Sequence, residues 1–368
     1  MNGSGHSRLR ILHIDPERNW GGGEAQVFGL LSYLVQRGHH NDLLAHPHGR
    51  LFQKCQELDV RTIPLVVRND LDLGSAAKLR RLIRRENYDI VHLHTKRAHA
   101  LSLWLAHKSP RPKYLVTRRM DYPESNNWYT RCLYNRKVDG VVAISQRIVE
   151  LLIEAGVRDD AIRLIHSGVD PRPFEAAVKK SGPRSGGIVV GMVAVLEERK
   201  GHGLLLEAAR RLKEQGCRIS YRFAGEGSLR KPLEATVDGL GLNEDVRFLG
   251  FVADVPGFLA EVDVVVLPSL FEGLGVSVLE AMAAGRAVIA SRVGGLPELV
   301  IDAATGFLVE PHDVAGLADA IAKLARDRSL LLSMGRRGRE RLQKNFTMER
   351  MARKNEDYYY SLLQSVGN

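Results

Sequence analysis

Two glutamates in the segment PSLFEGLGVSVLEAMAAG, residues 268–285, are the side chains of this sequence best placed for chemistry. Glu272 follows an apolar run, and Glu280 lies eight positions later among apolar residues at helical spacing. A carboxylate in such surroundings is costly unless it is hydrogen-bonded or paired. The two vicinal hydroxyls of a ribose would satisfy both oxygens of Glu280. The alternative is a structural salt bridge to Arg286 or Arg292.

Two glycine-containing loops are the next candidates. The segment ERKGHG, residues 198–203, lies between an apolar run and a helical pattern, so helix amides together with Arg199 and Lys200 could face an anion. A solvated turn with two surface cations is an equally good interpretation. The loop FAGEGSL carries Gly225 and Gly227 and could approach a ligand closely, although such a loop is more often only a turn.

The elements that must position these loops follow one plan twice. Residues 10–15 form an apolar run that leads into a glycine loop and then a helical pattern ended by Gly38. Residues 188–195 begin the same succession, and its helix is ended by Gly216. Further short β-branched runs alternate with helical patterns in both halves. This alternation predicts two parallel sheets covered by helices on both faces, an α/β fold.

The length of 368 residues exceeds the usual size of one hydrophobic core and predicts about two domains. Pro, Gly, Ser and Lys concentrate in residues 171–187, the best linker candidate. We therefore expect an N-terminal domain over 1–180, a C-terminal domain over 186–346 and a final helix over 347–368. A ligand is expected at the carboxyl ends of the strands, in a cleft between the domains.

Composition narrows the classes of function. The chain is 44% hydrophobic and 26% charged, as in soluble globular proteins, and its net charge of +10 favours anionic partners. No run of 18 apolar residues and no leader segment is visible, and the three cysteines form no CxxC pair. We expect a cytoplasmic protein. No zinc finger, basic zipper or aromatic RNA-binding motif supports nucleic acid as a partner.

Taken in order, the segments GGGEAQVFGLLSYLVQRGH, DIVHLH, FAGEGSLRKPLE and the block over 246–300 resemble the retaining glycosyltransferases of family 4. That family has the GT-B fold, in which two Rossmann-like doubly wound domains face a central cleft. The resemblance runs along nearly the whole chain, and its E-x7-E signature matches Glu272 and Glu280. It implies transfer of a sugar from a UDP- or GDP-linked donor to a cell-envelope glycan or lipid-linked acceptor, with no cofactor and no metal.

The resemblance also implies roles for matching positions. The N-terminal domain, completed by the final helix, would be the acceptor side, and the C-terminal domain would bind the nucleotide sugar. Glu280 would accept hydrogen bonds from the ribose, Glu272 would hold the sugar and phosphate, and Lys200 would neutralise the diphosphate leaving group. The other donor-side positions are Gly273, Leu274, Gly275 and Val276 at the helix start, Gly225 and Gly227 in the glycine loop, and Phe251 and Val252 near the base. The acceptor-side positions are Gly21, Gly22, Gly23, His94, Arg118 and Arg119.

Three positions depart from the family pattern. Val195 stands where the family often has an arginine, so Arg199 would have to supply the second positive charge. Arg118 or Arg119 replaces a histidine, and Ser167 stands where an asparagine is usual. These three departures affect the predicted binding of the donor sugar and the acceptor, and leave the predicted nucleotide-binding residues unchanged.

The sequence also allows other functions. Some nucleotide-sugar epimerases share the two-domain fold, and a non-catalytic sugar-binding protein would retain the same loops. A dehydrogenase is the weakest alternative, because neither glycine loop gives G-x-G-x-x-G with a suitably placed acid. An Asp-x-Asp metal motif at Asp70 and Asp72 fits a chance match, and the paired histidines at 46 and 48 and at 92 and 94 supply too few ligands for a metal.

The segment SAAKLRRLIRRENYD, residues 75–89, predicts a basic amphipathic helix. Such a helix could lie on an anionic membrane, which would place the protein on the inner face of the membrane. A solvated outer helix that packs its leucines on the sheet explains the pattern equally well.

Overall fold

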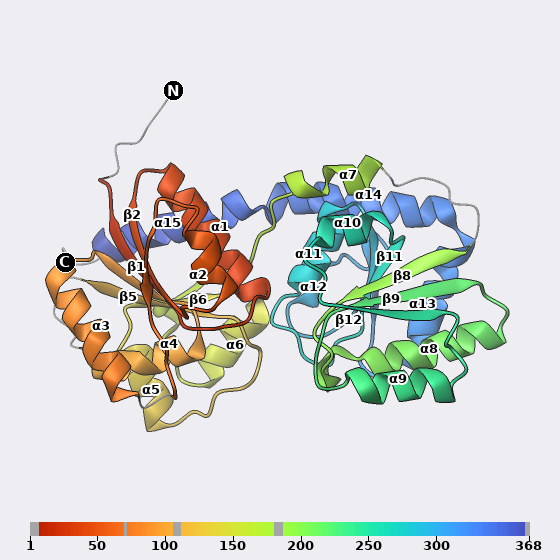
Figure 1. The fold of residues 1–368 in the computed structure, drawn as a ribbon, viewed down its shortest axis with the longest axis horizontal. Helices are drawn as coiled ribbons and strands as arrows, with labels where there is room; N and C mark the ends of the chain where they lie inside the picture. Colours follow the sequence, from red (N-terminus) through yellow and green to blue (C-terminus); the bar gives the residue numbers. More distant parts are fainter. Residues whose placement is uncertain (1–6, 70–71, 106–111, 180–186, 365–368) are drawn as a thin grey trace. The chain divides into compact units, whose positions relative to one another are not determined.

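The computed structural model describes residues 7–69, 72–105, 112–179 and 187–364, and the chain divides into two compact units (Figure 1). Unit 1 comprises Met1–Ser167 and Met348–Asn368, and unit 2 comprises Gly168–Thr347. The predicted linker begins as two short helices of unit 2, η3 (Arg172–Phe174) and α7 (Glu175–Lys179). Its remainder, with the predicted domain limit at 180–186, lies outside the described residues.

Unit 1 is built on a seven-stranded parallel sheet with the order β3-β2-β1-β4-β5-β6-β7. Its central strands are short apolar runs buried on both faces, as the sequence pattern requires of a parallel sheet. The strands are β1 (Arg10–Asp15), β2 (His40–Ala45), β3 (Arg61–Pro64), β4 (Ile90–Leu93), β5 (Lys113–Arg118), β6 (Gly140–Ala143) and β7 (Ile162–Leu164).

The last helix of the chain, α15 (Met348–Gln364), completes the core of unit 1. It packs against α1 (Gly22–Gln36), where Gly29 leaves room for the Met348 side chain. Tyr358 of α15 donates a hydrogen bond to the carbonyl of Ala161 at 2.8 Å, and the neighbouring Tyr359 is fully buried. The other helices of unit 1 are α2 (Arg50–Cys55), α3 (Leu73–Glu86), α4 (Lys96–Leu101), α5 (Trp128–Asn135) and α6 (Gln146–Glu154).

Unit 2 repeats the plan with a six-stranded parallel sheet in the order β10-β9-β8-β11-β12-β13. The strands are β8 (Ile188–Val193), β9 (Ile219–Ala224), β10 (Val246–Gly250), β11 (Val264–Leu267), β12 (Ala287–Ser291) and β13 (Gly306–Val309). The helices are α8 (His202–Glu214), α9 (Arg230–Gly239), α10 (Val255–Ala260), α11 (Val276–Ala283), α12 (Leu296–Leu299), α13 (Val314–Arg326) and α14 (Arg328–Asn345). In the described ranges, no helix is long and apolar enough to cross a membrane.

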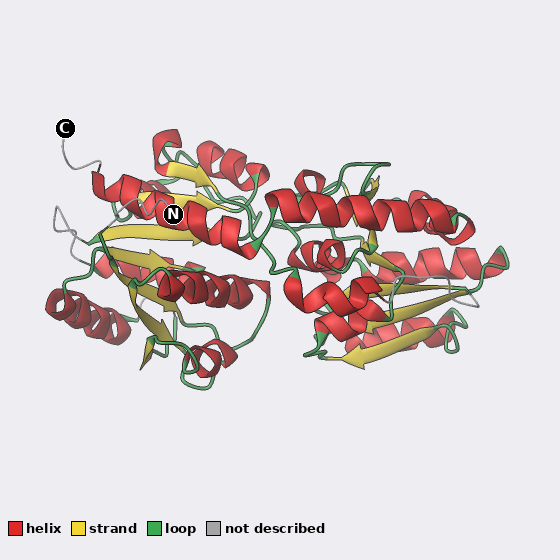
Figure 2. Cartoon of the chain, turned by 90° about the horizontal axis from the view of Figure 1, so that it is seen from above, coloured by secondary structure: helices red, strands yellow, loops and turns green. Residues whose placement is uncertain are grey.

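Each sheet has a point where the strand order changes direction. In unit 1 it lies between β1 and β4, and in unit 2 between β8 and β11. Helices cover both faces of each sheet (Figure 2), so a ligand reaches the sheet only at its edges and at the ends of its strands. In open α/β sheets, ligands bind outside the carboxyl ends of the strands at such switch points. The loops that follow these four strands are therefore the expected ligand-binding loops.

Candidate active site

The loops after β8 and β11 meet at the switch point of unit 2. Leu270 donates its amide hydrogen to the carbonyl of Arg199 at 2.8 Å, which fastens one loop to the other. The ammonium of Lys200 pairs with the carboxylate of Glu272 at 2.5 Å, and their side chains are only 11% and 12% exposed. The hydroxyl of Ser269 reaches the same carboxylate at 3.4 Å. The structure thus brings the two predicted residues together in a largely desolvated ion pair.

The close approach of these loops depends on Gly201, which has a φ of +74°. A Cβ there would lie 2.0 Å from the carbonyl oxygen of Pro268. We expect Gly201→Ala to lower the free energy of unfolding by at least about 2 kcal/mol, because a positive φ and a backbone clash combine. Gly203→Ala is the matched control, since a Cβ at Gly203 meets nothing within 4 Å. Urea unfolding measures both, and equal stability of the two variants would contradict this account.

Glu280 lies in α11, which begins after Gly275 in the left-handed conformation with φ +98°. Glu280 is partly exposed, its carboxylate has no hydrogen-bond or ion-pair partner among the described residues, and partial desolvation raises its pKa from 4.5 to about 7. Arg286 donates to the carbonyls of Leu259 and Ala177. Arg292 pairs with two other carboxylates, those of Asp302 and Glu310. The structural salt bridge considered from the sequence is therefore not formed.

The raised pKa of Glu280 predicts a pH-dependent cost to the fold. Its carboxyl keeps its proton in the folded protein up to about pH 7 but loses it in the unfolded chain above about pH 4.5. The folded state binds more protons across this window, so stability falls as pH rises through it. We expect Glu280→Gln to raise the free energy of unfolding at pH 8 by roughly 1 to 3 kcal/mol, and by little at pH 4.5.

Urea unfolding at the two pH values tests this expectation. The matched control is Glu244→Gln, which changes an exposed glutamate of the same unit. A Glu280→Gln variant that gains no more stability at pH 8 than at pH 4.5 would show that the carboxyl titrates normally.

The glycine loop after β9 packs on the loop after β8. A Cβ at Gly225 would lie 1.9 Å from the carbonyl oxygen of Ala194, and one at Gly227 would lie 2.4 Å from that of Leu196. Packing between these loops therefore accounts for both glycines. Phe251 follows β10 and is 41% exposed, with Val252 partly exposed beside it in the chain.

The partner of Arg199, the cation next to Lys200, differs from the one expected from the sequence. Arg199 pairs with Glu197 at 2.7 Å rather than joining the Lys200–Glu272 pair. Val195 is 43% exposed. His202, which was not predicted as a site residue, is buried, and both of its ring nitrogens lack hydrogen-bond partners among the described residues. Desolvation and then the charge of Lys200 lower its pKa to about 4, so His202 is neutral at neutral pH.

Unit 1 gathers part of the predicted acceptor-side set at its own switch point. Gly21 precedes α1, and its amide donates to the Glu24 carboxylate at 2.7 Å. Arg119 lies over this turn, since a Cβ at Gly23 would be 3.6 Å from its Cδ. His94, which follows β4, and Arg119 line one small cavity. Gly22 is the first residue of α1.

Arg118 is directed to different partners from those of Arg119. It pairs with Glu124 at 2.7 Å and donates to the carbonyl of Tyr122 at 2.9 Å. Asp15, the last residue of β1, was also not predicted as a site residue. Burial, followed by the charge of Glu24, raises the pKa of Asp15 to about 7. The acidic end of a buried apolar run was the available signal.

The Asp-x-Asp motif has a structural explanation at its described end. Asp72 caps α3 by accepting a hydrogen bond from the amide of Ser75 at 3.0 Å. Asp70 lies outside the described residues. Among the described residues, one group of three metal-capable side chains comes together, formed by His13, His92 and His94.

Comparisons with known proteins agree with this geometry. Residues 20–172 match the family described as Glycosyltransferase Family 4, and residues 173–341 match Glycosyl transferases group 1. The chain is 30% identical over 361 residues to the lipopolysaccharide core biosynthesis glycosyltransferase LpsE of Rhizobium meliloti, covering 97% of this chain and 99% of LpsE. It is 32% identical over 228 residues to the 2-deoxystreptamine glucosyltransferase of Streptomyces kanamyceticus, covering 59% of each.

A solved structure resembles the whole fold. Anabaena Alr3699/HepE in complex with UDP and glucose has a TM-score of 0.84 at 22% identity, covering 96% of this chain and all of HepE. Two parallel-sheet Rossmann-like units of this kind define the GT-B class of glycosyltransferases, and the predicted fold class is confirmed. The chain belongs to glycosyltransferase family 4.

Proposed function

We propose that this protein is a retaining glycosyltransferase that moves a sugar from a nucleoside-diphosphate donor to a cell-envelope glycan or lipid-linked acceptor. The observation that carries the proposal is the Glu280 carboxylate, which is partly exposed in a largely apolar helix and has no hydrogen-bond or ion-pair partner among the described residues. A carboxylate without a partner in apolar surroundings costs the folded protein free energy. Hydrogen bonds from the ribose hydroxyls would offset that cost. The relative in lipopolysaccharide core biosynthesis supports the envelope acceptor, and the UDP bound to HepE supports a uridine donor.

In this proposal the leaving diphosphate is stabilised by protein groups rather than by a metal. Lys200 supplies a positive charge already positioned by Glu272. The helix that begins at Val276 adds main-chain amides that have no partner within the helix. These groups do not need to reorganise as charge develops on the diphosphate oxygen. No cofactor is required, and the nucleotide sugar is the substrate.

A donor panel tests the proposal. UDP-glucose, UDP-N-acetylglucosamine and GDP-mannose are compared by thermal shift, because a bound donor raises the melting temperature by mass action. With the donor that binds, NMR follows the first hexose released to water, with and without EDTA. Initial release of the α-anomer from an α-linked donor at equal rates supports retention without a metal. Initial release of the β-anomer would contradict retention, and a lower rate with EDTA would contradict metal independence. Epimerisation of the donor without release of the sugar would indicate an epimerase.

Association with an anionic membrane surface is part of the proposal. Leu79 and Ile83 of α3 are buried, while the arginines of the same helix at positions 80, 81, 84 and 85 are exposed. Attachment through α3 would therefore be electrostatic, worth about 1 kcal/mol for each cation. We expect flotation with anionic vesicles at low salt, none with neutral vesicles, and loss at high salt. Equal behaviour with both vesicle types would refute it.

A further inference from the structure

A small cavity in unit 1 collects buried polar atoms that have no partner. Its volume is about 10 Å³. Four of the residues that line it each carry a buried side-chain atom without a hydrogen-bond partner among the described residues. They are His94 (Nδ1), Arg119 (Nε), Ser167 (Oγ) and Asn355 (Oδ1). Orphaned polar atoms are rare in folded proteins because each costs about 1 to 3 kcal/mol, so four around one cavity indicate a polar occupant.

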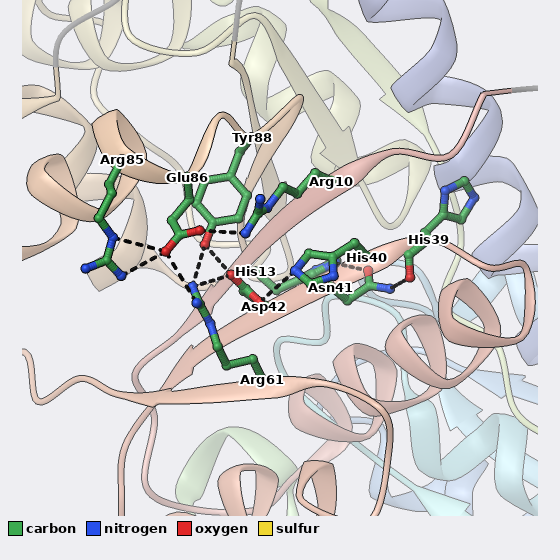
Figure 3. Close-up of polar contacts among 10 residues, drawn as sticks. All are labelled: Arg10, His13, His39, His40, Asn41, Asp42, Arg61, Arg85, Glu86 and Tyr88. Carbon is green, nitrogen blue, oxygen red and sulfur yellow. Dashed lines mark hydrogen bonds and ion pairs between the residues drawn. The ribbon is translucent and has the colours of Figure 1, made fainter.

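The hydrogen bonds behind His94 determine which of its nitrogens carries the proton. The side-chain amide of Asn41 donates to the main-chain carbonyl of His39 at 3.0 Å, so its oxygen accepts from Nε2 of His13 at 3.3 Å (Figure 3). Nδ1 of His13 is then unprotonated and accepts from Nε2 of His94 at 3.0 Å. His94 is thereby left with a lone pair on Nδ1, the atom that has no partner.

His94 keeps this tautomer because it stays neutral. Burial, reinforced by neighbouring His92, His13 and Arg119, holds its pKa well below the usual value. Burial also lowers the pKa of His13 to about 3. Nδ1 of His94 is therefore a hydrogen-bond acceptor at neutral pH and a poor proton acceptor.

The same histidines could be read as a metal site, but their hydrogen bonds oppose it. Ligand atoms of His13, His92 and His94 lie within 4.8 Å of one another. However, both nitrogens of His92 contact hydroxyls at 2.7 Å, those of Tyr359 and Thr117, and His13 is committed to its two neighbours. A three-histidine metal site would have to break several of these bonds. One open nitrogen, that of His94, favours a hydrogen-bonded ligand.

The size of the cavity and the polar atoms around it restrict the chemical groups that could occupy it. A cavity of about 10 Å³ holds roughly one oxygen atom, as a water or a hydroxyl group, and excludes a whole sugar ring. His94 and Asn355 offer acceptors, Arg119 offers a donor, and Ser167 can be either. A hydroxyl both donates and accepts, whereas an ionised carboxylate cannot donate to His94.

We propose that this cavity is a subsite for one hydroxyl of a sugar ligand, with His94 Nδ1 as its acceptor and with His13 and Asn41 as positioning residues. The inference rests on the proposed function, since the sugar is either the transferred hexose or the acceptor. Two of the lining residues, Arg119 and Ser167, are positions where the sequence departs from the family pattern. They would make the subsite particular to this chain.

NMR of the full chain labelled with ¹⁵N-histidine tests the subsite. The free protein should show His94 with Nδ1 unprotonated, and a bound hydroxyl should shift that nitrogen while leaving His312, an exposed histidine of unit 2, unshifted. A shift with UDP-glucose beyond that with UDP assigns the transferred sugar. A shift with methyl glucoside or methyl mannoside in the presence of UDP assigns an acceptor. Unchanged His94 with every sugar would mean a structural water only and overturn the proposal.

Variants separate the subsite from folding. Ser167→Ala should weaken the affinity for the sugar, measured by titrating the His94 shift, roughly three- to tenfold. Ser102→Ala should not, because Ser102 is equally buried and unpartnered in unit 1 but does not line the cavity. Asn41→Ala should give a mixed His94 tautomer, a signature that simple destabilisation does not produce.

Zinc titration and UDP binding provide two further tests of the subsite. A Zn²⁺-induced shift of all three histidines would overturn the hydroxyl subsite in favour of a metal site. UDP binding, measured by thermal shift in the same samples, reports the proposed function separately. Retained UDP binding with an unresponsive His94 would refute the subsite alone.

Discussion

Replacing Lys200 by alanine is expected to lower kcat by roughly 10²- to 10³-fold, the usual cost of removing a preorganised group that stabilises developing charge. Lys200 is the cation held against Glu272 at the switch point of unit 2, and Arg199 is engaged with Glu197. With Val195 where an arginine would otherwise stand, the proposal gives Lys200 the main electrostatic role. Donor hydrolysis at saturating nucleotide sugar measures kcat directly.

Two comparisons keep the Lys200 result interpretable. Lys213→Ala removes an exposed ion pair with Asp245 and should leave kcat unchanged, which controls for net charge. Lys200→Arg restores the charge and should recover part of the rate. The alanine variant leaves Glu272 without its main partner, so its melting temperature must be measured as well. A correctly folded Lys200→Ala enzyme with an unchanged kcat would refute the assigned role.

Replacing Glu280 by glutamine is expected to weaken nucleotide binding roughly 10- to 100-fold, because hydrogen bonds to a charged group are worth about 1.5 to 3 kcal/mol. The same variant should be more stable than the wild type at pH 8, because the partly desolvated carboxylate is gone. This opposition between affinity and stability distinguishes a ligand-binding carboxylate from a structural one. Calorimetric titration of UDP, with Glu244→Gln as control, measures the loss.

Periodicity predicted the sheets and the loops that carry the site, because local spacing of apolar residues decides what each segment can bury. It also predicted the apolar surroundings of Glu280, since those neighbours lie within the same helix. The family resemblance added the pairing of roles between Glu272 and Glu280, which remains a prediction.

Contacts between distant segments could not be predicted in this way. His13 meets His94 across 81 positions because strand register aligns β1 with β4. Arg118 turns to Glu124 while the adjacent Arg119 lines the cavity, a difference that depends on side-chain packing and not on residue type. Arg199 likewise pairs with a residue two positions away. When several carboxylates could pair with one arginine, the spacing of residues in the sequence does not indicate which pair forms.

The role proposed for the Glu280 carboxylate is to accept hydrogen bonds from the ribose hydroxyls. The most direct test is a cycle in which wild type and Glu280→Ala each bind UDP and 2′,3′-dideoxyuridine diphosphate, measured by calorimetric titration. Wild type should lose roughly 10- to 100-fold on removal of the hydroxyls, and Glu280→Ala should bind both ligands equally weakly. Full additivity of the two losses would show that Glu280 and the ribose do not interact, and would contradict the account.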